Sequence, residues 1–97
     1  MIRSFKNQGT EDIFNGKFTK EARQVCPSSL WDMAARKLDM LDSAVIVNDL
    51  RSPPGNRLEK LKGDRTGYYS MRINDQYRIC FTWVKGPEEV EITNYHK

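Results

Sequence analysis

Hydrophobic and polar residues follow a helical period in the first half of this chain and a period of two in the second half. The clearest helical stretch is residues 28–44 (SSLWDMAARKLDMLDSA), where apolar residues return every three or four positions. Ser29, with Asp32 three residues later, resembles a capping box. We expect a helix that packs one stripe into the core, flanked by Trp31 and Ala35 and made of Leu30, Ala34, Leu38, Leu41 and Val45.

Shorter elements are predicted before this helix. Residues 1–5 (MIRSF) alternate between apolar and polar side chains and predict a first strand. Residues 10–16 (TEDIFNG) predict a short helix, with Thr10 as its N-cap, two acidic residues in its first turn and Gly16 at its end. Residues 17–27 have no clear period, and the sequence leaves open whether they form a second helical piece or a mobile loop.

The period changes after residues 51–56 (RSPPGN), where two prolines and a glycine suit neither a helix nor a central strand. Four alternating stretches follow, at residues 57–63, 67–73, 77–83 and 90–96. Helices followed by a run of hairpins predict an α+β fold. We expect a single domain over residues 1–97, with an N-terminal strand and helices packed on one face of an antiparallel β-sheet.

The alternation assigns the side chains of the last three strands to two faces. One face is apolar and is expected to meet the helices: Met71, Ile73, Ile79, Phe81, Trp83, Val90 and Ile92. The other parity sends Arg72, Arg78 and Tyr95 to one exposed face. A three-residue loop at 74–76 keeps the faces unmixed and pairs Arg72 with Arg78, whereas a two-residue loop would mix them. Two facing arginines suit a phosphate bound between them, and the alternative is that Glu91 neutralises one of them.

Composition limits the class of protein. With 97 residues, 38% hydrophobic and 30% charged, the chain is globular but has little core to spare. No apolar run approaches the roughly 20 residues that span a bilayer, and the N-terminus lacks the apolar stretch of a signal peptide. We therefore expect a cytoplasmic protein with no membrane partner. Cys26 and Cys80 lack metal-ligand spacing, so we expect two reduced structural thiols and no metal or other cofactor.

Positive charge is concentrated in one segment of the chain. The net charge is +3, and residues 51–78 hold seven Lys or Arg against three Asp or Glu. A basic segment of this kind is expected when a polyanion is met on one face. An ordinary solvated surface explains the same charge equally well.

The only histidine, His96, follows Tyr95 near the C-terminus. Histidine is the usual general acid or base near neutral pH, although one beside a chain end is most often an exposed bystander. Tyr95 can bond a hydroxyl or stack on a base, and Glu59, with Lys60 and Lys62 nearby, is a second candidate for proton transfer. Cleavage of RNA through its 2′-OH needs a base, an acid and cations for the developing phosphorane charge. This set of residues fits that list without a metal.

Three stretches resemble the HigB branch of the RelE superfamily, bacterial toxins of toxin–antitoxin pairs. They are MIRSF at the start, DLRSPPGNRLEKLKGDRTGYYSMRINDQYRICFTW at 49–83, and VEITNYH at 90–96. The resemblance implies a compact RelE-like, microbial-ribonuclease-like fold. It also implies cleavage of messenger RNA in the A site of the 30S ribosomal subunit, without a cofactor. The implied partner is a cognate helix-turn-helix antitoxin (HigA-like), with which the toxin represses its own operon, so that operator DNA is met only through the antitoxin.

The resemblance also assigns roles to single residues. The catalytic cluster of the family falls on Asn94, Tyr95 and His96, and its phosphate-holding positions fall on Lys62, Arg72 and Arg78. Lys60 and Arg65 of the same basic segment are further candidates for binding RNA.

The chain departs from the pattern of the family at two of these positions. Relatives often have Asp at position 94, and one branch has His at position 59. Glu59 can still act as a base, whereas Asn94 can only orient the substrate. Two alternatives therefore stay open: a toxin of this fold that inhibits a protein such as DNA gyrase, and a ribosome-binding toxin that cuts slowly.

Overall fold

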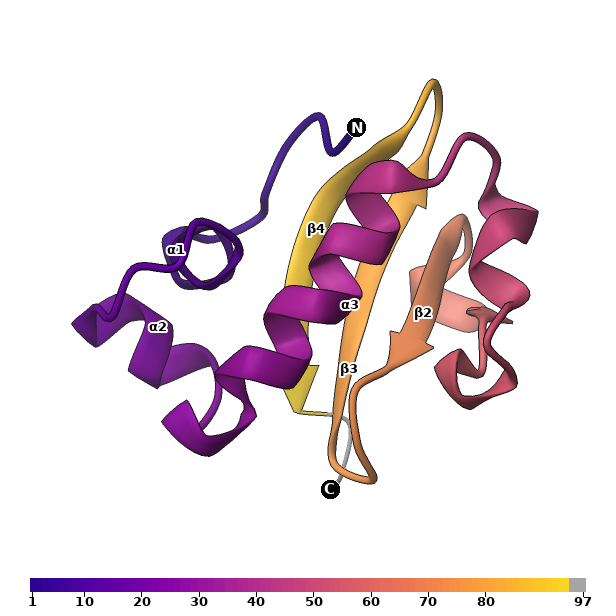
Figure 1. Cartoon of the computed structure of the whole chain (residues 1–97). Coiled ribbons are helices and arrows are strands. Elements are labelled where there is room, and N and C mark those ends of the chain that lie inside the picture. The colour runs from indigo at the N-terminus through magenta and orange to yellow at the C-terminus, as the bar shows by residue number, and fades with distance from the viewer. Residues whose placement is uncertain (95–97) are drawn as a thin grey trace.

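A four-stranded antiparallel sheet, in the order β1-β2-β3-β4, is the framework of residues 1–94, the part of the chain that the computed structural model describes (Figure 1). Helix α3 crosses one face of the sheet, and α1 and α2 lie beside β4. The strands are β1 Glu59–Lys60, β2 Tyr68–Arg72, β3 Tyr77–Trp83 and β4 Pro87–Asn94. The α-helices are α1 Gln8–Phe14, α2 Lys20–Val25 and α3 Trp31–Ser43, and the short 3₁₀ helices are η1 Ser28–Leu30, η2 Val47–Arg51, η3 Pro54–Asn56 and η4 Gly63–Arg65. The predicted α+β fold is confirmed.

The register of the β2–β3 hairpin is the predicted one. Met71 pairs with Ile79 and Arg72 pairs with Arg78. The side-chain oxygen of Asn74 accepts hydrogen bonds from the backbone nitrogens of Gln76 (2.9 Å) and Tyr77 (2.7 Å), which closes the three-residue loop. This register keeps the apolar residues of both strands on the face that meets α3.

The first and last strands differ in length from the prediction. β1 has two residues because Arg57 before it has a left-handed backbone (φ 45°), and the chain turns into η4 after it. β4 begins at Pro87 rather than at residue 90. Its pairing with β3 shifts between Cys80 and Thr82, so that Glu89 and Val90 lie opposite one residue, in a bulge where Glu89 has φ 52°.

The N-terminal segment is not the strand that alternation predicts. Residues 1–5 run beside β4 and form one parallel bridge, from Phe5 to Val90. Arg3, Ser4 and Lys6 make backbone hydrogen bonds to β4, but at the bulge the Glu89 nitrogen donates to the hydroxyl of Ser4 (2.9 Å) rather than to a backbone carbonyl. The segment still covers part of the outer edge of β4, since the Arg3 nitrogen donates to the Pro87 carbonyl (2.8 Å).

Helix α1 begins three residues earlier than predicted. Its N-cap is Asn7, whose side-chain oxygen accepts a hydrogen bond from the Thr10 nitrogen (2.9 Å). The prediction of Thr10 as the cap is wrong: Thr10 is buried inside the helix, and its hydroxyl accepts from the Ile92 nitrogen (3.0 Å). This bond joins α1 to β4.

The stretch that the sequence left open, residues 17–27, contains α2. The Thr19 hydroxyl caps this helix by accepting from the Ala22 nitrogen (3.0 Å). A side chain at Gly9 would place its Cβ 2.2 Å from Val25 Cγ2, so glycine is what lets α1 and α2 pack this closely.

Helix α3 supplies the core side chains that its stripe predicts. Trp31, Ala34, Leu38 and Leu41 are buried, together with Met71, Ile79, Phe81 and Val90 of the sheet. Two details of the prediction are wrong. The N-cap of α3 is Leu30, the last residue of η1, so no Ser29–Asp32 capping box starts the helix. Val45 is 83% exposed because α3 ends at Ser43 and the extended Ala44 turns the chain away from the stripe.

Candidate functional site

The strand registers place three of the predicted site residues, Glu59, Arg72 and Arg78, on the sheet face opposite α3. Two rows of paired residues cross this face, because residues that pair across strands point to the same side. One row contains Glu59, Ser70, Cys80 and Glu91, and the next contains Arg72, Arg78 and Thr93.

Arg78 is held by several groups on this face. Its Nε donates to the Ser70 hydroxyl (2.8 Å), and its Nη2 donates to the carbonyl oxygens of Arg57 (2.6 Å) and Ser70 (3.3 Å). The same Nη2 lies 3.8 Å from Glu59 Oε1. The expectation of an exposed Arg78 is wrong, since only 8% of the residue is exposed. Its guanidinium plane is fixed by the protein.

The loop before β1 places the Arg57 carbonyl against Arg78. Arg57 follows η3 and is left-handed (φ 45°, ψ 55°), a conformation that non-glycine residues seldom adopt. The buried Asn56 stabilises this loop, because its Nδ2 donates to the Leu50 carbonyl (3.1 Å) and its Oδ1 accepts from Lys37 of α3. The local sequence predicted a break here, but not that the break would hold a functional side chain.

Arg72 lies opposite Arg78 and pairs with Asp75 of the neighbouring loop. The alternative that Glu91 neutralises one of these two arginines is wrong. Glu91 Oε1 instead lies 3.2 Å from Arg65 Nη2 and 3.7 Å from Lys6 Nζ. The charges of the facing arginines are instead balanced by Asp75, beside Arg72, and by Glu59, beside Arg78.

Lys37 is a cation that sequence reasoning missed. Burial, and then the positive charge of Arg72, lower the pKa of Lys37 below its ordinary value. Lys37 therefore lies close enough to Arg72 for their charges to interact. Its place beside the apolar stripe of α3 indicated partial burial, but no local pattern indicated which strand it would meet.

The other basic candidates are divided between the two faces. Arg65 lies over the Tyr68 ring (5.0 Å from its guanidinium carbon to the ring centroid) on the face of Arg78. Lys60 pairs with Tyr69, whose ring stacks on the core residue Phe81, so the register assigns Lys60 to the opposite face. Lys62 is exposed at the start of η4.

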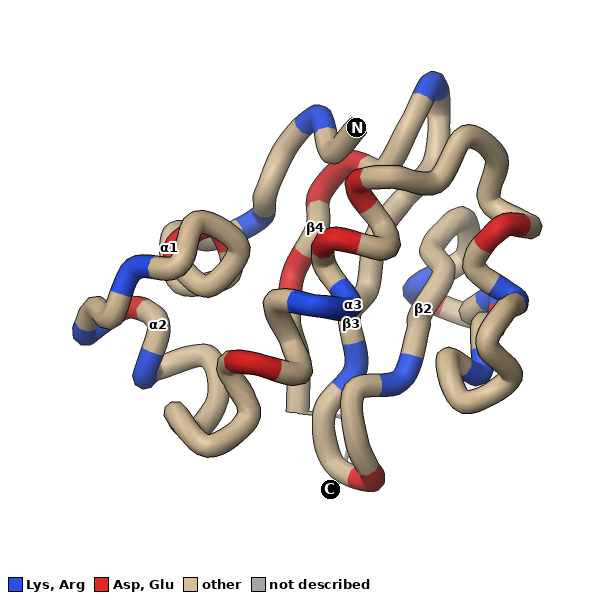
Figure 2. The backbone as a smooth tube through the Cα atoms, in the orientation of Figure 1, with Lys and Arg blue, Asp and Glu red and all other residues tan. Residues whose placement is uncertain are grey.

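The last described residue, Asn94, is exposed and pairs with Tyr77, so the register assigns it, like Lys60, to the face opposite that of Arg78. The predicted catalytic residues Tyr95 and His96 lie outside the described residues. β4 ends at the same end of the sheet as the β2–β3 loop (Figure 1). Basic residues of α3, β2 and β3 gather toward that end (Figure 2).

This geometry suits an anion beside a carboxylate. Arg72, whose side chain is about one-third exposed, and the fixed Arg78 opposite it place two guanidinium charges side by side, and such charges attract phosphate oxygens. Glu59, more than half exposed and 3.8 Å from Arg78, adds a proton acceptor beside that phosphate position.

The cysteines are not nucleophiles in this structure. Cys26 and Cys80 are both free and buried. Burial raises the pKa of Cys26 to about 11 and also raises the pKa of Cys80, so both thiols stay protonated near neutral pH. Residues 1–94 contain no cluster of three or more His, Cys, Asp or Glu side chains that could hold a metal ion. No helix in this part of the chain has the length and apolar character needed to cross a bilayer.

The fold is that of the RelE-like toxins. A chain of the YoeB–YefM complex from Staphylococcus aureus superposes with a TM-score of 0.60 at 28% identity, covering 100% of this chain and 97% of that chain. The sequence profile of the RelE-like toxin of type II toxin–antitoxin system HigB matches residues 3–96. The protein belongs to this HigB-like toxin family.

Two members of known name have sequences similar to this chain over most of its length. It is 41% identical over 86 residues to Toxin HigB-1 of Vibrio cholerae, covering 89% of this chain and 87% of the relative. It is 32% identical over 95 residues to Endoribonuclease HigB of Proteus vulgaris, covering 98% and 96% of the two chains.

Proposed function

We propose that this toxin is an endoribonuclease that cleaves messenger RNA in the ribosomal A site without a metal ion. The observation that carries the proposal is the Arg78 guanidinium, fixed by Ser70 and Arg57 beside Glu59 and opposite Arg72. The name of the Proteus vulgaris relative, an endoribonuclease, supports the same activity.

In the proposed reaction the 2′-oxygen attacks the adjacent phosphorus and the bond from phosphorus to the 5′-oxygen breaks, leaving a 2′,3′-cyclic phosphate. Glu59 accepts the proton of the 2′-OH, and the imidazolium of His96 gives a proton to the leaving 5′-oxygen. Arg78 and Arg72 stabilise the charge on the phosphorane oxygens. Tyr95 stacks on or bonds the substrate, and Asn94 orients it.

The remaining basic residues contact the RNA backbone in this proposal. Arg65 and Lys62 hold phosphates that flank the scissile one, whereas Lys60 meets RNA outside the site because its register places it on the other face. The ribosome positions the codon, so free RNA is a poor substrate.

The proposed partner is a helix-turn-helix antitoxin of the HigA kind. Membership of a type II toxin family, and a structural neighbour that is a YoeB–YefM complex, support a protein partner. The pair would repress its own operon, with the antitoxin alone touching DNA. In gel shifts the antitoxin should bind operator DNA without the toxin, and the toxin alone should bind none.

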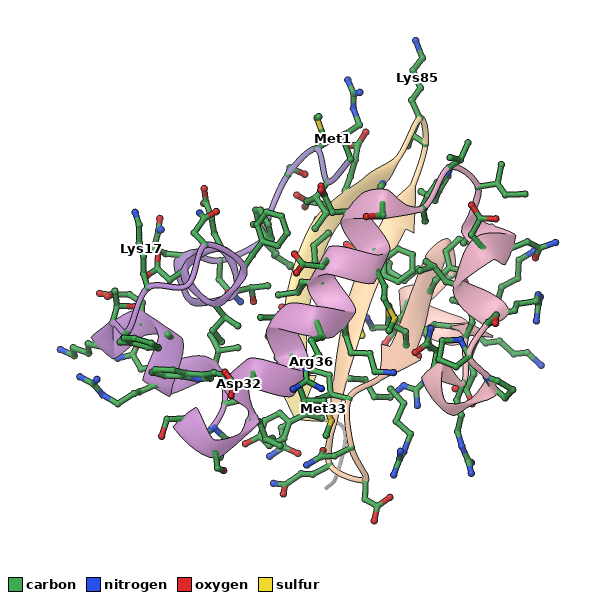
Figure 3. All side chains as sticks on the ribbon, viewed as in Figure 1. Met1, Lys17, Asp32, Met33, Arg36 and Lys85 are labelled. Atoms are coloured by element: carbon green, nitrogen blue, oxygen red, sulfur yellow. The ribbon has the colours of Figure 1, made fainter. Side chains whose placement is uncertain are left out.

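Toeprinting of messenger RNA in a cell-free translation reaction tests the ribonuclease activity. The wild type should cut in the A-site codon, and His96→Gln should reduce the cleavage rate by about 10²–10⁴-fold. Arg78→Gln should do likewise while its circular dichroism shows a folded chain. Lys85→Gln, at the hairpin tip far from the end of β4 (Figure 3), is the matched control and should cut normally. If the folded wild-type toxin leaves A-site codons intact, the proposal is rejected. If that toxin inhibits supercoiling by gyrase instead, its target is a protein.

A further inference from the structure

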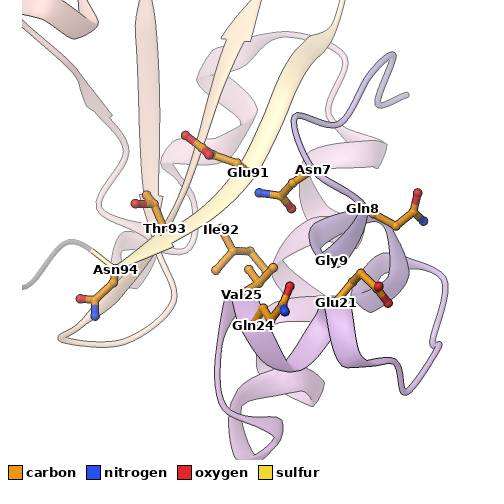
Figure 4. A pocket seen from close by; sticks show the side chains of 10 residues that line it. All are labelled: Asn7, Gln8, Gly9, Glu21, Gln24, Val25, Glu91, Ile92, Thr93 and Asn94. Carbon is orange, nitrogen blue, oxygen red and sulfur yellow. The ribbon is translucent and has the colours of Figure 1, made fainter.

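A cavity of about 420 Å³ lies beside the site described above, between the end of β4 and the helices α1 and α2 (Figure 4). Residues 91–94 of β4 form one wall. The start of α1 (residues 7–9) and one side of α2 form the other. The proposed reaction uses none of the α1 and α2 residues.

The floor of the cavity is apolar and its rim carries amide side chains. Val25 and Ile92 face one another across it, and the Gln24 amide lies beside them (Figure 4). The Asn7 oxygen is occupied by the Thr10 nitrogen, which leaves the Asn7 amide nitrogen pointing toward β4. Gln24 is exposed to solvent at this rim. An apolar floor with a few polar groups at the rim is typical of a small-molecule site.

The charges of the lining favour amino groups over a phosphate. Glu21 and Glu91 both line the cavity, and its lining contains neither Lys nor Arg. Glu91 is already paired with Arg65 and Lys6, so Glu21 is the carboxylate that can accept a hydrogen bond from an exocyclic amino group, as carboxylates accept from the amino group of cytosine. Amide side chains add donors and acceptors of the kind that pair with base edges.

The cavity adjoins the proposed phosphate position. Thr93, which lines it, is the cross-strand partner of Arg78. Neighbouring strands lie about 4.8 Å apart, a separation that one nucleotide spans between its phosphate and its base.

We propose that this cavity is a nucleobase subsite that receives a base next to the scissile phosphate. The inference rests on the proposed ribonuclease function. Val25 and Ile92 contact the face of the base, while Asn7, Gln24 and Glu21 bond its edge. Bases with an amino group, adenine, cytosine and guanine, bind better than uracil, which has none.

Titration of the ¹⁵N-labelled toxin with uncharged nucleosides tests the subsite without ribosomes and without cleavage. Adenosine and cytidine should shift the side-chain amide signals of Asn7 and Gln24 at millimolar concentration, and uridine should shift them less. Asn48, an exposed amide on η2, is the internal control and should not move. Unmoved Asn7 and Gln24 signals would overturn the subsite. So would shifts caused only by a lysine- or arginine-containing peptide, which would assign the cavity to a basic protein segment.

The variant Glu21→Ala links the cavity to substrate choice. Glu21 is exposed, so its loss should leave the fold intact. In the translation reaction the preference for amino-bearing bases over uracil should fall about tenfold, the discrimination of one good hydrogen-bonded pair, while Asn48→Ala should keep it. An unchanged preference would overturn the subsite. If nucleosides shift the amide signals but the wild-type toxin never cuts RNA, the proposed ribonuclease function is rejected and the base-binding cavity is retained.

Discussion

Arg78 becomes a specific site only through the residues that hold it. A free arginine side chain has many rotamers, whereas here Ser70 and the Arg57 carbonyl bind two of its nitrogens. Ser70 is fully buried, and its hydroxyl is an acceptor for the charged Nε. The predicted pairing of Arg72 with Arg78 is correct, but alternation alone does not show that Arg78 is covered.

Ser70→Ala should destabilise the protein and reduce cleavage. Loss of the hydroxyl leaves a buried, charged Nε without its acceptor, and we expect the free energy of unfolding in urea to fall by about 1–3 kcal/mol. Ser70→Thr, which keeps the hydroxyl, should restore most of the cleavage rate. Equal rates for the Ala variant and the wild type would show that Ser70 does not position Arg78.

Glu89→Gly should stabilise the protein. Glu89 has φ 52° in the bulge of β4, and a non-glycine residue there costs on the order of 1 kcal/mol. Glycine relieves this cost, so the urea midpoint should rise relative to Glu89→Ala, which keeps the strained backbone and serves as the control. A lower midpoint for Gly than for Ala would show that the bulge is not strained at this residue.

At the scale of elements, α1 and α2 are organised around one carboxylate. Asp12 of α1 accepts hydrogen bonds from the hydroxyl of Thr19 (2.7 Å) and from the side-chain nitrogen of Gln8 (2.8 Å). Thr19 also caps α2, so a single residue joins the end of one helix to the start of the next. The sequence left this stretch unassigned because Thr19 makes two kinds of hydrogen bond that have no hydrophobic period. One joins it to Asp12, seven residues earlier, and the other caps α2.

The Asp12 carboxylate should make stability fall in acid. Hydrogen bonds from Thr19 and then Gln8 hold the pKa of Asp12 below its ordinary value. A folded pKa below the unfolded one gives stability that is present above the unfolded pKa and is lost as the pH falls through the folded pKa. The difference in the free energy of unfolding between the wild type and Asp12→Asn should therefore be constant near neutral pH and shrink in acid, as urea unfolding at a series of pH values will measure. Asp39→Asn, at an exposed position on α3, is the control. A difference that stays constant in acid would contradict the prediction.

At the scale of the whole molecule, the sheet separates two tasks. Its apolar face packs on α3, and its other face carries the arginines and carboxylates of the proposed site. Because α3 covers one side only, a change in the core acts on the site through the position of the strands. Lys37 connects the two sides, because this α3 side chain donates a hydrogen bond to Asn56 of the loop and its charge interacts with that of Arg72.

Leu38→Ala should weaken this packing. Leu38 is fully buried between α3 and the sheet, and truncation of a buried leucine costs about 2–5 kcal/mol. The midpoint of urea unfolding should fall accordingly. Met33→Ala, on the exposed side of the same helix (Figure 3), should change it much less. Similar losses for the two variants would show that α3 does not pack by the stripe described.

The sequence by itself determined the α+β class, the core stripe of α3 and the register of the β2–β3 hairpin. These follow from local periodicity, and a one-residue slip would reverse a whole face of the sheet. Only the tertiary structure decided that Arg78 is buried, that Glu91 pairs with Lys6 and Arg65, and that Asn7 and Gln24 meet at a cavity beside β4. These contacts join residues far apart in the chain, and the packing of loops and helices against the sheet brings them together, which no local pattern encodes.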